Sequence, residues 1–161
     1  MLQIIIDHIP SSLLHALAGA LIIDIFFGSK YPIKKRLSII FSGSLLVFTL
    51  DIPKLFGFIF THSLFFVPFI SAGLALFSRK VITEPFIKQW LGIICVLLIG
   101  GILIDYLGNG AHLFYPITAR NFSYSLITRE FWLILVLGFI IVIRLIFSYK
   151  KELIRGLSLT R

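Results

Sequence analysis

Long apolar runs separated by short polar connectors constrain this chain more than any other feature of its sequence. Of its 161 residues, 58% are hydrophobic and 14% are charged, whereas soluble domains are about half apolar and a quarter charged. The mean hydropathy of +1.04 is typical of integral membrane proteins. We therefore predict an all-α fold, an integral membrane bundle of about five transmembrane helices, in a single domain over residues 1–161.

Turn signals divide the apolar runs into predicted helices at about 12–27, 37–51, 61–77, 90–107 and 131–149. Pro10 predicts the start of the first helix, because the two serines after it can cap free amides. Pro53 predicts the end of the second helix, and Pro68 predicts a kink in the third. Small residues on the first helix predict the close approach of another helix: Ala16, Ala18, Gly19 and Ala20.

Lysine and arginine gather in alternate connectors. Eleven of them lie in segments 29–36 and 78–89 and in the C-terminal tail. The connectors on the opposite side of the membrane would hold three, Lys54, Arg120 and Arg129. Arg144 lies within the last predicted helix, and its side chain can snorkel toward the tail. The positive-inside rule then predicts a multi-pass protein of the inner (plasma) membrane with its amino terminus outside and its carboxyl terminus cytoplasmic. This pattern accounts for the net charge of +8, so we expect membrane lipid and no nucleic acid as a partner. An acid near the start argues against a cleaved signal peptide.

Aspartate and histidine residues collect at the predicted outer ends of the helices. His15, Asp51, His62 and Asp105 lie there, and His112 follows in an outer connector. Ionisable groups at this depth are costly unless they are paired or bound to something. Carboxylates and imidazoles together form a ligand set for metals such as zinc, manganese or iron. We therefore predict a divalent metal site, zinc or manganese, whose candidate ligands are these five residues.

Each candidate also has a structural interpretation. The two aspartates could be solvated helix ends, and the histidines could hydrogen-bond to carbonyls or to a neighbouring helix. Asp7 and His8 fit ordinary loop positions. At the inner end, Asp24 is expected to pair with Arg36 or Lys35. Ser63 has no base and oxyanion arrangement around it in the sequence, so we do not expect a serine nucleophile.

Several short motifs, in order over roughly residues 12 to 120, resemble the LexA-regulated, inner-membrane metal-dependent hydrolase family. Members typically show an early His-x-x-x-Gly, a Pro-Asp-x-Asp, a His-Arg-x-x-Thr-His-Ser, and an Asp-x-x-Thr followed by a Tyr-Pro-Phe-like segment. The matching segments here are His15-Ala16-Leu17-Ala18-Gly19, Asp51-Ile52-Pro53-Lys54, Thr61-His62-Ser63, Ile104-Asp105-Tyr106-Leu107 and Leu113-Phe114-Tyr115-Pro116. By matching position, the resemblance implies His15, Asp51, His62 and Asp105 as metal ligands. A more remote similarity to zinc-dependent phospholipases C and nucleases favours phosphoester substrates.

This sequence departs from the family pattern at three positions. Thr49 stands where the first aspartate of the acid pair is expected, Gly57 where the first histidine is expected, and Gly108 where the threonine is expected. The resemblance therefore leaves open a one-metal site, a site completed by His112 or His8, and an inactive relative.

From these features we predict a membrane-embedded, metal-dependent hydrolase that acts at the outer membrane interface on lipid phosphoesters. The metal would activate a water molecule, and Asp51 or Asp105 would be the catalytic base. The alternative is a non-enzymatic membrane protein or an inactive relative that uses the same polar cluster for helix packing or for binding an ion or a partner. Polar residues concentrated at one membrane face count against a pore.

Overall fold

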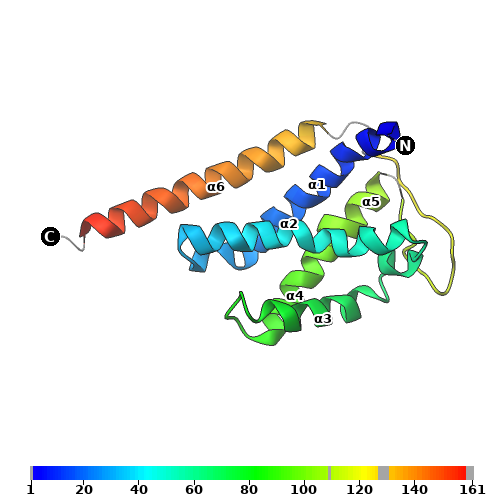
Figure 1. Cartoon of the computed structure of the whole chain (residues 1–161), viewed down its shortest axis with the longest axis horizontal. Coiled ribbons are helices and arrows are strands. Elements are labelled where there is room, and N and C mark those ends of the chain that lie inside the picture. The colour runs from blue at the N-terminus through cyan, green and yellow to red at the C-terminus, as the bar shows by residue number, and fades with distance from the viewer. Residues whose placement is uncertain (1, 109, 127–130, 159–161) are drawn as a thin grey trace.

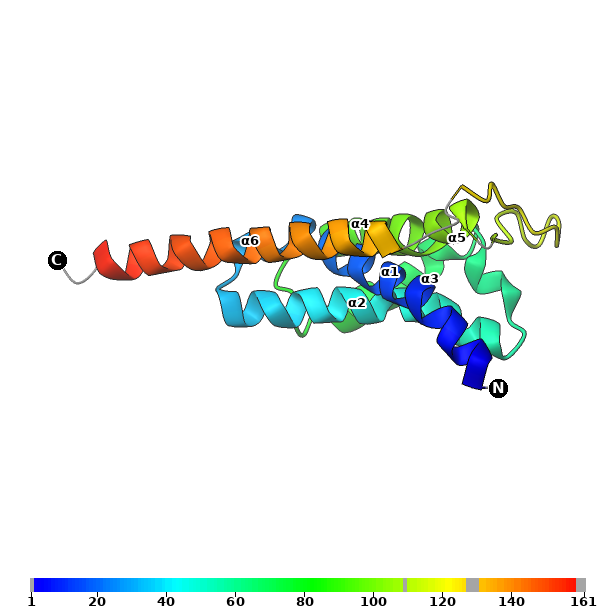
Figure 2. The ribbon, with the colours of Figure 1, turned by 90° about the horizontal axis from the view of Figure 1, so that it is seen from above.

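The computed structural model describes residues 2–108, 110–126 and 131–158 of the chain. Within these ranges the chain is helical and forms no β-strand beyond an isolated bridge between Ala111 and Phe122. The predicted all-α fold is therefore confirmed. The helices pack side by side, with α6 along one side of the bundle and extending beyond the others at its C-terminal end (Figures 1 and 2).

The long helices are α1 (Leu2–Phe26), α2 (Ile33–Leu55) and α6 (Phe131–Ser158). The shorter α3 (Val67–Ser78) follows a 3-10 turn, η2 (Ile59–His62), and another 3-10 turn, η1 (Gly28–Lys30), joins α1 to α2. α4 (Phe86–Cys95) continues directly into a π-helical stretch, η3 (Val96–Leu103), and then into α5 (Ile104–Leu107). These last three elements form one continuous rod.

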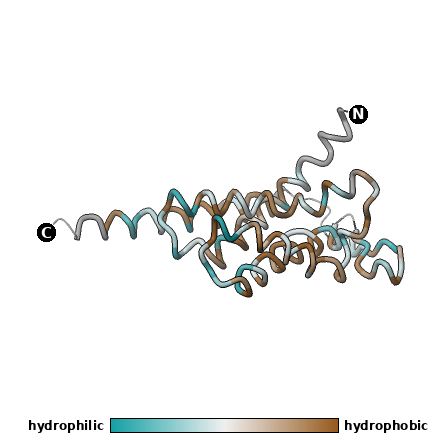
Figure 3. Tube along the Cα trace, turned by 60° about the horizontal axis from the view of Figure 1, so that its bottom comes forward, coloured by the Kyte–Doolittle hydropathy of each residue, from teal (hydrophilic) through white to brown (hydrophobic). Residues whose placement is uncertain are grey.

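Three of the described helices are long and apolar enough to cross a membrane: Ile33–Pro53, Phe86–Leu107 and Trp132–Ile154. Two further apolar helices, Pro10–Phe26 and Val67–Ser78, are shorter. Hydrophobic residues run through the helical body (Figure 3). The long helices coincide with three of the five predicted spans, and Pro10–Phe26 coincides with a fourth. Val67–Ser78 begins six residues later than the predicted 61–77 helix, because residues 59–62 form the 3-10 turn η2 instead.

The prolines act differently from their predicted roles. α1 begins at Leu2 and continues through Pro10, so this proline, which cannot donate a helical hydrogen bond, does not end the helix. α2 runs two residues past Pro53, whose carbonyl then accepts from the amides of Phe56 and Phe58 at 3.0 Å. The predicted kink at Pro68 is wrong, since Pro68 lies in the first turn of α3, where its missing N–H costs nothing.

Glycines bring α1, α2 and η3 close together. A Cβ atom added at Gly19 would collide with the carbonyl of Gly43 on α2, and one at Gly100 would crowd the backbone of Gly19. The close approach predicted from the small residues of the first helix is therefore confirmed at Gly19. This packing places the backbone of η3 beside α1, one turn away from His15.

The basic connectors meet at one end of the bundle. Lys30 and Tyr31 bond across to Glu84 and Thr83, at 2.7 and 3.1 Å, and the amide of Ile33 donates to Glu152 near the end of α6 at 2.7 Å. This is the left end in Figure 1, and α5 and the amino terminus lie at the right. Four other basic side chains counted in the sequence lie outside the described residues: Lys54, Arg129, Arg155 and Arg161.

A buried ion-pair cluster lies toward the basic end. Arg36 donates to both carboxylate oxygens of Asp24 at 2.6 Å, which confirms the predicted pairing. Arg144 of α6 donates to the same carboxylate at 2.6 Å rather than extending toward the tail as we expected. The Asp24 carboxylate is buried, and it attracts the guanidinium of Arg144, which would otherwise face an apolar surface.

Candidate metal centre

Four ionisable side chains from four separate elements converge at the end of the bundle opposite the basic connectors. They are His15 of α1, Asp51 of α2, His62 of η2 and Asp105 of α5. His15, His62 and Asp105 are buried, whereas the Asp51 side chain retains 32% of its exposure. The convergence expected from the sequence is thus found for these four candidates.

The four side chains form a continuous series of contacts. Nε2 of His15 lies 3.1 Å from Oδ1 of Asp105, and Oδ2 of Asp105 lies 3.0 Å from Nε2 of His62. The same His62 nitrogen lies 3.1 Å from Oδ1 of Asp51. Two carboxylates therefore approach one imidazole nitrogen, and one of them also contacts the second imidazole.

The imidazole of His15 is oriented by a backbone carbonyl. Its Nδ1 lies 2.7 Å from the carbonyl oxygen of Gly100 in η3, and because a carbonyl can only accept, Nδ1 carries the hydrogen. Nε2 is then the atom presented to Asp105. π-Helical stretches often occur at functional sites, and here the stretch supplies the residue that fixes this imidazole.

The hydroxyl of Thr61 orients the second imidazole in the same way. Thr61 donates to the carbonyl of Leu50 at 2.9 Å, and its oxygen lies 3.3 Å from Nδ1 of His62. Because the Thr61 hydroxyl donates its hydrogen to Leu50, its oxygen acts as the acceptor for Nδ1–H of His62. Nε2 of His62 therefore faces the two carboxylates. A ligating histidine typically donates its other N–H to a protein acceptor in this manner.

The distances and the donor set fit a metal ion. Single ligand atoms of Asp51, His62 and Asp105 all lie within 4.8 Å of one another, and a group of this kind could hold a metal. In a tetrahedral zinc site with bonds of about 2.0–2.2 Å, ligand atoms lie about 3.3–3.6 Å apart. The observed 3.0 and 3.1 Å contacts at Nε2 of His62 would need to open by only a few tenths of an ångström.

The charge of the cluster also favours a cation. With neutral imidazoles the four side chains carry two negative charges in a mostly buried place, and buried charge must be compensated. A divalent cation would neutralise the two carboxylates. Protonation of both imidazoles would also neutralise the two carboxylates. The same four residues would then form ion pairs without a metal.

Ser63, next to His62, has a structural role. Its hydroxyl donates to the carbonyl of Tyr115 and accepts from the amide of Phe65 at 3.2 Å, and the amide of Leu64 donates to the carbonyl of Leu113 at 3.0 Å. These bonds attach the 111–124 connector to the turn that carries His62. The hydroxyl is thus engaged in hydrogen bonds to the backbone.

His112 is not a member of the Asp51, His62 and Asp105 group. Its Nδ1 donates to the carbonyl of Ala119 at 2.9 Å within the same connector. The side chains of Asp7 and His8 lie outside the described residues.

Two of the three positions at which the sequence departs from the family motifs, Thr49 and Gly57, supply no replacement ligand. Thr49 donates to the carbonyl of Leu46 on its own helix at 2.6 Å. Gly57 is exposed, has a φ of +83° and has open space where a Cβ would lie. The group of Asp51, His62 and Asp105 could therefore hold one metal ion.

Sequence reasoning missed two groups that orient the imidazoles, the carbonyl of Gly100 and the hydroxyl of Thr61. Gly100 and Gly101 are adjacent in an apolar run, and paired glycines of this kind mark close backbone approach. Thr61 directly precedes His62, and this adjacency was its available signal.

No protein-family model, curated protein or solved structure matches the chain.

Proposed function

We propose that this chain is a metal-dependent hydrolase of the inner membrane. It would hold one divalent ion, zinc or manganese, and cleave an ester or phosphoester of a membrane lipid at the outer interface. The observation that carries this proposal is the approach of two carboxylates, Asp51 and Asp105, to Nε2 of His62 at 3.1 and 3.0 Å. His15 lies outside this three-residue group and would orient Asp105 through the 3.1 Å contact between its Nε2 and Oδ1 of the carboxylate.

The two carboxylates would have different roles. Asp105 is buried and each of its oxygens faces an imidazole, which suits a fixed ligand. Asp51 is partly exposed and contacts the cluster through Oδ1, so it can reach a water molecule and accept its proton as general base. A divalent metal in this place would supply polarisation of the ester or phosphoryl oxygen.

The proposed orientation follows from the distribution of charge. The described basic connectors lie at one end of the bundle, and the candidate centre lies at the other. By the positive-inside rule the basic end is cytoplasmic, so the amino terminus and the candidate centre would face outward. In this orientation a lipid headgroup could reach the candidate centre from the outer bilayer surface.

The chain would be a relative of the LexA-regulated, inner-membrane metal-dependent hydrolases with a reduced ligand set. Thr49 and Gly57 stand at two expected ligand positions, and neither offers a ligand to the cluster. We therefore propose a one-metal form of the site.

A second candidate function is non-enzymatic. The four side chains can compensate one another if both imidazoles are protonated, since each Nε2 would then donate to a carboxylate at 3.0–3.1 Å. The cluster would then join α1, α2, η2 and α5 as a packing element, and the chain could bind a partner through its exposed surface.

Hydrolysis assays on the full chain in detergent distinguish the two candidates. Protein loaded with zinc or manganese would be incubated with glycerophospholipids, and released headgroups and fatty acids would be measured by mass spectrometry. We expect Asp51→Asn to lower turnover by about 100-fold or more, as expected for loss of a general base. His112→Ala is the matched control and should retain activity. If metal-loaded wild-type protein cleaves none of the lipids, the non-enzymatic function is favoured.

A further inference from the structure

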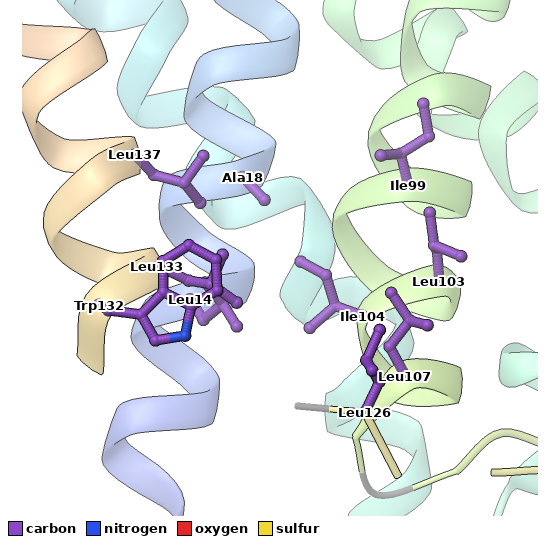
Figure 4. Close-up of a pocket in the computed structure, with 10 residues that line it drawn as sticks. All are labelled: Leu14, Ala18, Ile99, Leu103, Ile104, Leu107, Leu126, Trp132, Leu133 and Leu137. Atoms are coloured by element: carbon purple, nitrogen blue, oxygen red, sulfur yellow. The ribbon is translucent and has the colours of Figure 1, made fainter. Parts of the chain in front are cut away.

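An apolar cavity of about 430 Å³ lies between α1, α6 and the rod formed by η3 and α5 (Figure 4). Cavities of about 300–1,000 Å³ are typical of ligand sites. Its walls include Leu14 and Ala18 of α1, Leu103 and Ile104 of the rod, and Trp132 and Leu137 of α6. The indole N–H of Trp132 is the sole polar side-chain group among the described lining residues.

The cavity lies directly beside the candidate metal centre. Leu14 precedes His15, and Ile104 precedes Asp105, and these two polar side chains are joined at 3.1 Å. Successive residues of a helix point about 100° apart. The apolar wall and the polar cluster therefore lie on adjoining faces of the same two elements, at the same depth in the bundle.

The cavity is accessible from the side of the bundle that would face lipid. Trp132 is 61% exposed, and Ile99 and Leu103 on the opposite wall are 47% and 43% exposed. The apolar segment Trp132–Ile154 of α6 has no residue buried inside the protein. A lipid chain could thus enter laterally between α6 and the rod without crossing a polar surface.

The geometry points to this cavity as the acyl-chain site of the lipid on which the candidate metal centre acts. Its occupant is one acyl chain of a membrane glycerophospholipid, because an apolar cavity beside a carboxylate and imidazole cluster complements a molecule with an apolar chain and a phosphoester headgroup. This inference rests on the proposed function and defines its substrate class. Chain binding would hold the headgroup ester near Asp51, the accessible member of the cluster.

Quenching of Trp132 fluorescence by a phosphatidylcholine with brominated acyl chains tests the inference. The full chain in detergent would carry Trp90→Phe, since the protein has two tryptophans and Trp90 packs elsewhere, against Pro68 and Ser71. We expect quenching that saturates near one lipid per protein. Quenching that rises linearly without saturation would show simple partitioning and overturn the inference.

Two variants fill the cavity from opposite walls, Ala18→Phe on α1 and Leu103→Phe on the rod. Each should raise the lipid concentration at half-quenching by about tenfold or more, because lost apolar contacts weaken binding by this order. Ala72→Phe on α3, which does not line the cavity, is the matched control and should bind as before. If both filling variants bind the lipid as tightly as the control, the chain is bound elsewhere and the inference is wrong.

Metal content and circular dichroism of the same samples separate this inference from the proposed function. A filling variant is taken as folded if its helicity by circular dichroism is unchanged. If Ala18→Phe does not fold, Leu103→Phe still tests the cavity, because it leaves every side chain of α1 unchanged. Bound metal without saturable quenching overturns the acyl-chain site alone. Saturable quenching without bound metal overturns the hydrolase proposal and leaves the cavity as a lipid-binding site.

Discussion

Nε2 of His15 lies 3.1 Å from Oδ1 of Asp105, although ninety residues separate the two in the sequence. The contact depends on the glycines that bring α1 against η3 and on the carbonyl of Gly100, which fixes the imidazole from its other side. It joins the first helix to the series of contacts that continues through His62 to Asp51. The candidate centre is therefore built by helix packing rather than by a local motif.

Replacing Thr61 by valine tests the group that orients His62. Valine has the shape of threonine but cannot accept from Nδ1–H of His62 or donate to Leu50. Loss of such an orienting partner typically weakens metal affinity by about 10–100-fold. Competition with a zinc chelator measures this, and Thr61→Ser, which keeps the hydroxyl, is the control. Equal zinc affinity in Thr61→Val and wild type would show that the hydroxyl does not support a ligand.

The two carboxylates should contribute unequally to metal binding. Asp105 contacts both imidazoles and is buried, whereas Asp51 contacts His62 and is partly exposed. Asp105→Asn should therefore lower zinc affinity by more than about 100-fold, beyond the effect of an orienting group, and Asp51→Asn by less. Calorimetric titration of both variants gives the order. A larger loss in Asp51→Asn would reverse the roles we assign.

The ion-pair cluster at the basic end should be important for stability. Asp24→Ala leaves the buried guanidinium of Arg36 without its carboxylate, and breaking a buried pair costs about 3–5 kcal/mol. Arg144→Met should cost less, because Arg144 is 32% exposed and Asp24 keeps Arg36. Denaturant unfolding in detergent compares the two. Equal losses would mean that Arg144 is as essential to the cluster as Asp24.

The connector ion pairs predict a dependence of stability on pH. The ammonium of Lys30 at 2.7 Å, and then that of Lys88 at 3.1 Å, hold the pKa of Glu84 below its ordinary value of 4.5. A pKa that is lower in the folded state stabilises the fold above the unfolded pKa, and this stabilisation is lost as the pH falls through the folded pKa. The advantage of wild type over Glu84→Gln in thermal unfolding should therefore be present near neutral pH and shrink in acid. An advantage that grows in acid would contradict this prediction.

Hydropathy and charge sufficed to predict the helical fold and the end at which the polar residues gather. The ligand candidates His15, Asp51, His62 and Asp105 could be predicted because ionisable groups in apolar runs stand out by their cost. The roles of the prolines could not, since a proline fits the interior of α1 or the first turn of α3 depending on neighbours. Backbone partners such as the Gly100 carbonyl depend on packing and on the π-helical stretch, and residue identity does not reveal them.

Metal content is the most direct test of the candidate centre. Wild type purified in detergent would be reconstituted with zinc or manganese and compared by mass spectrometry with His62→Ala and Asp105→Ala, with His112→Ala as the control outside the cluster. We predict about one equivalent of metal in wild type and His112→Ala and its loss in the other two variants. Absence of bound metal from reconstituted wild type, or its full retention in both cluster variants, would contradict a metal centre at His62 and Asp105.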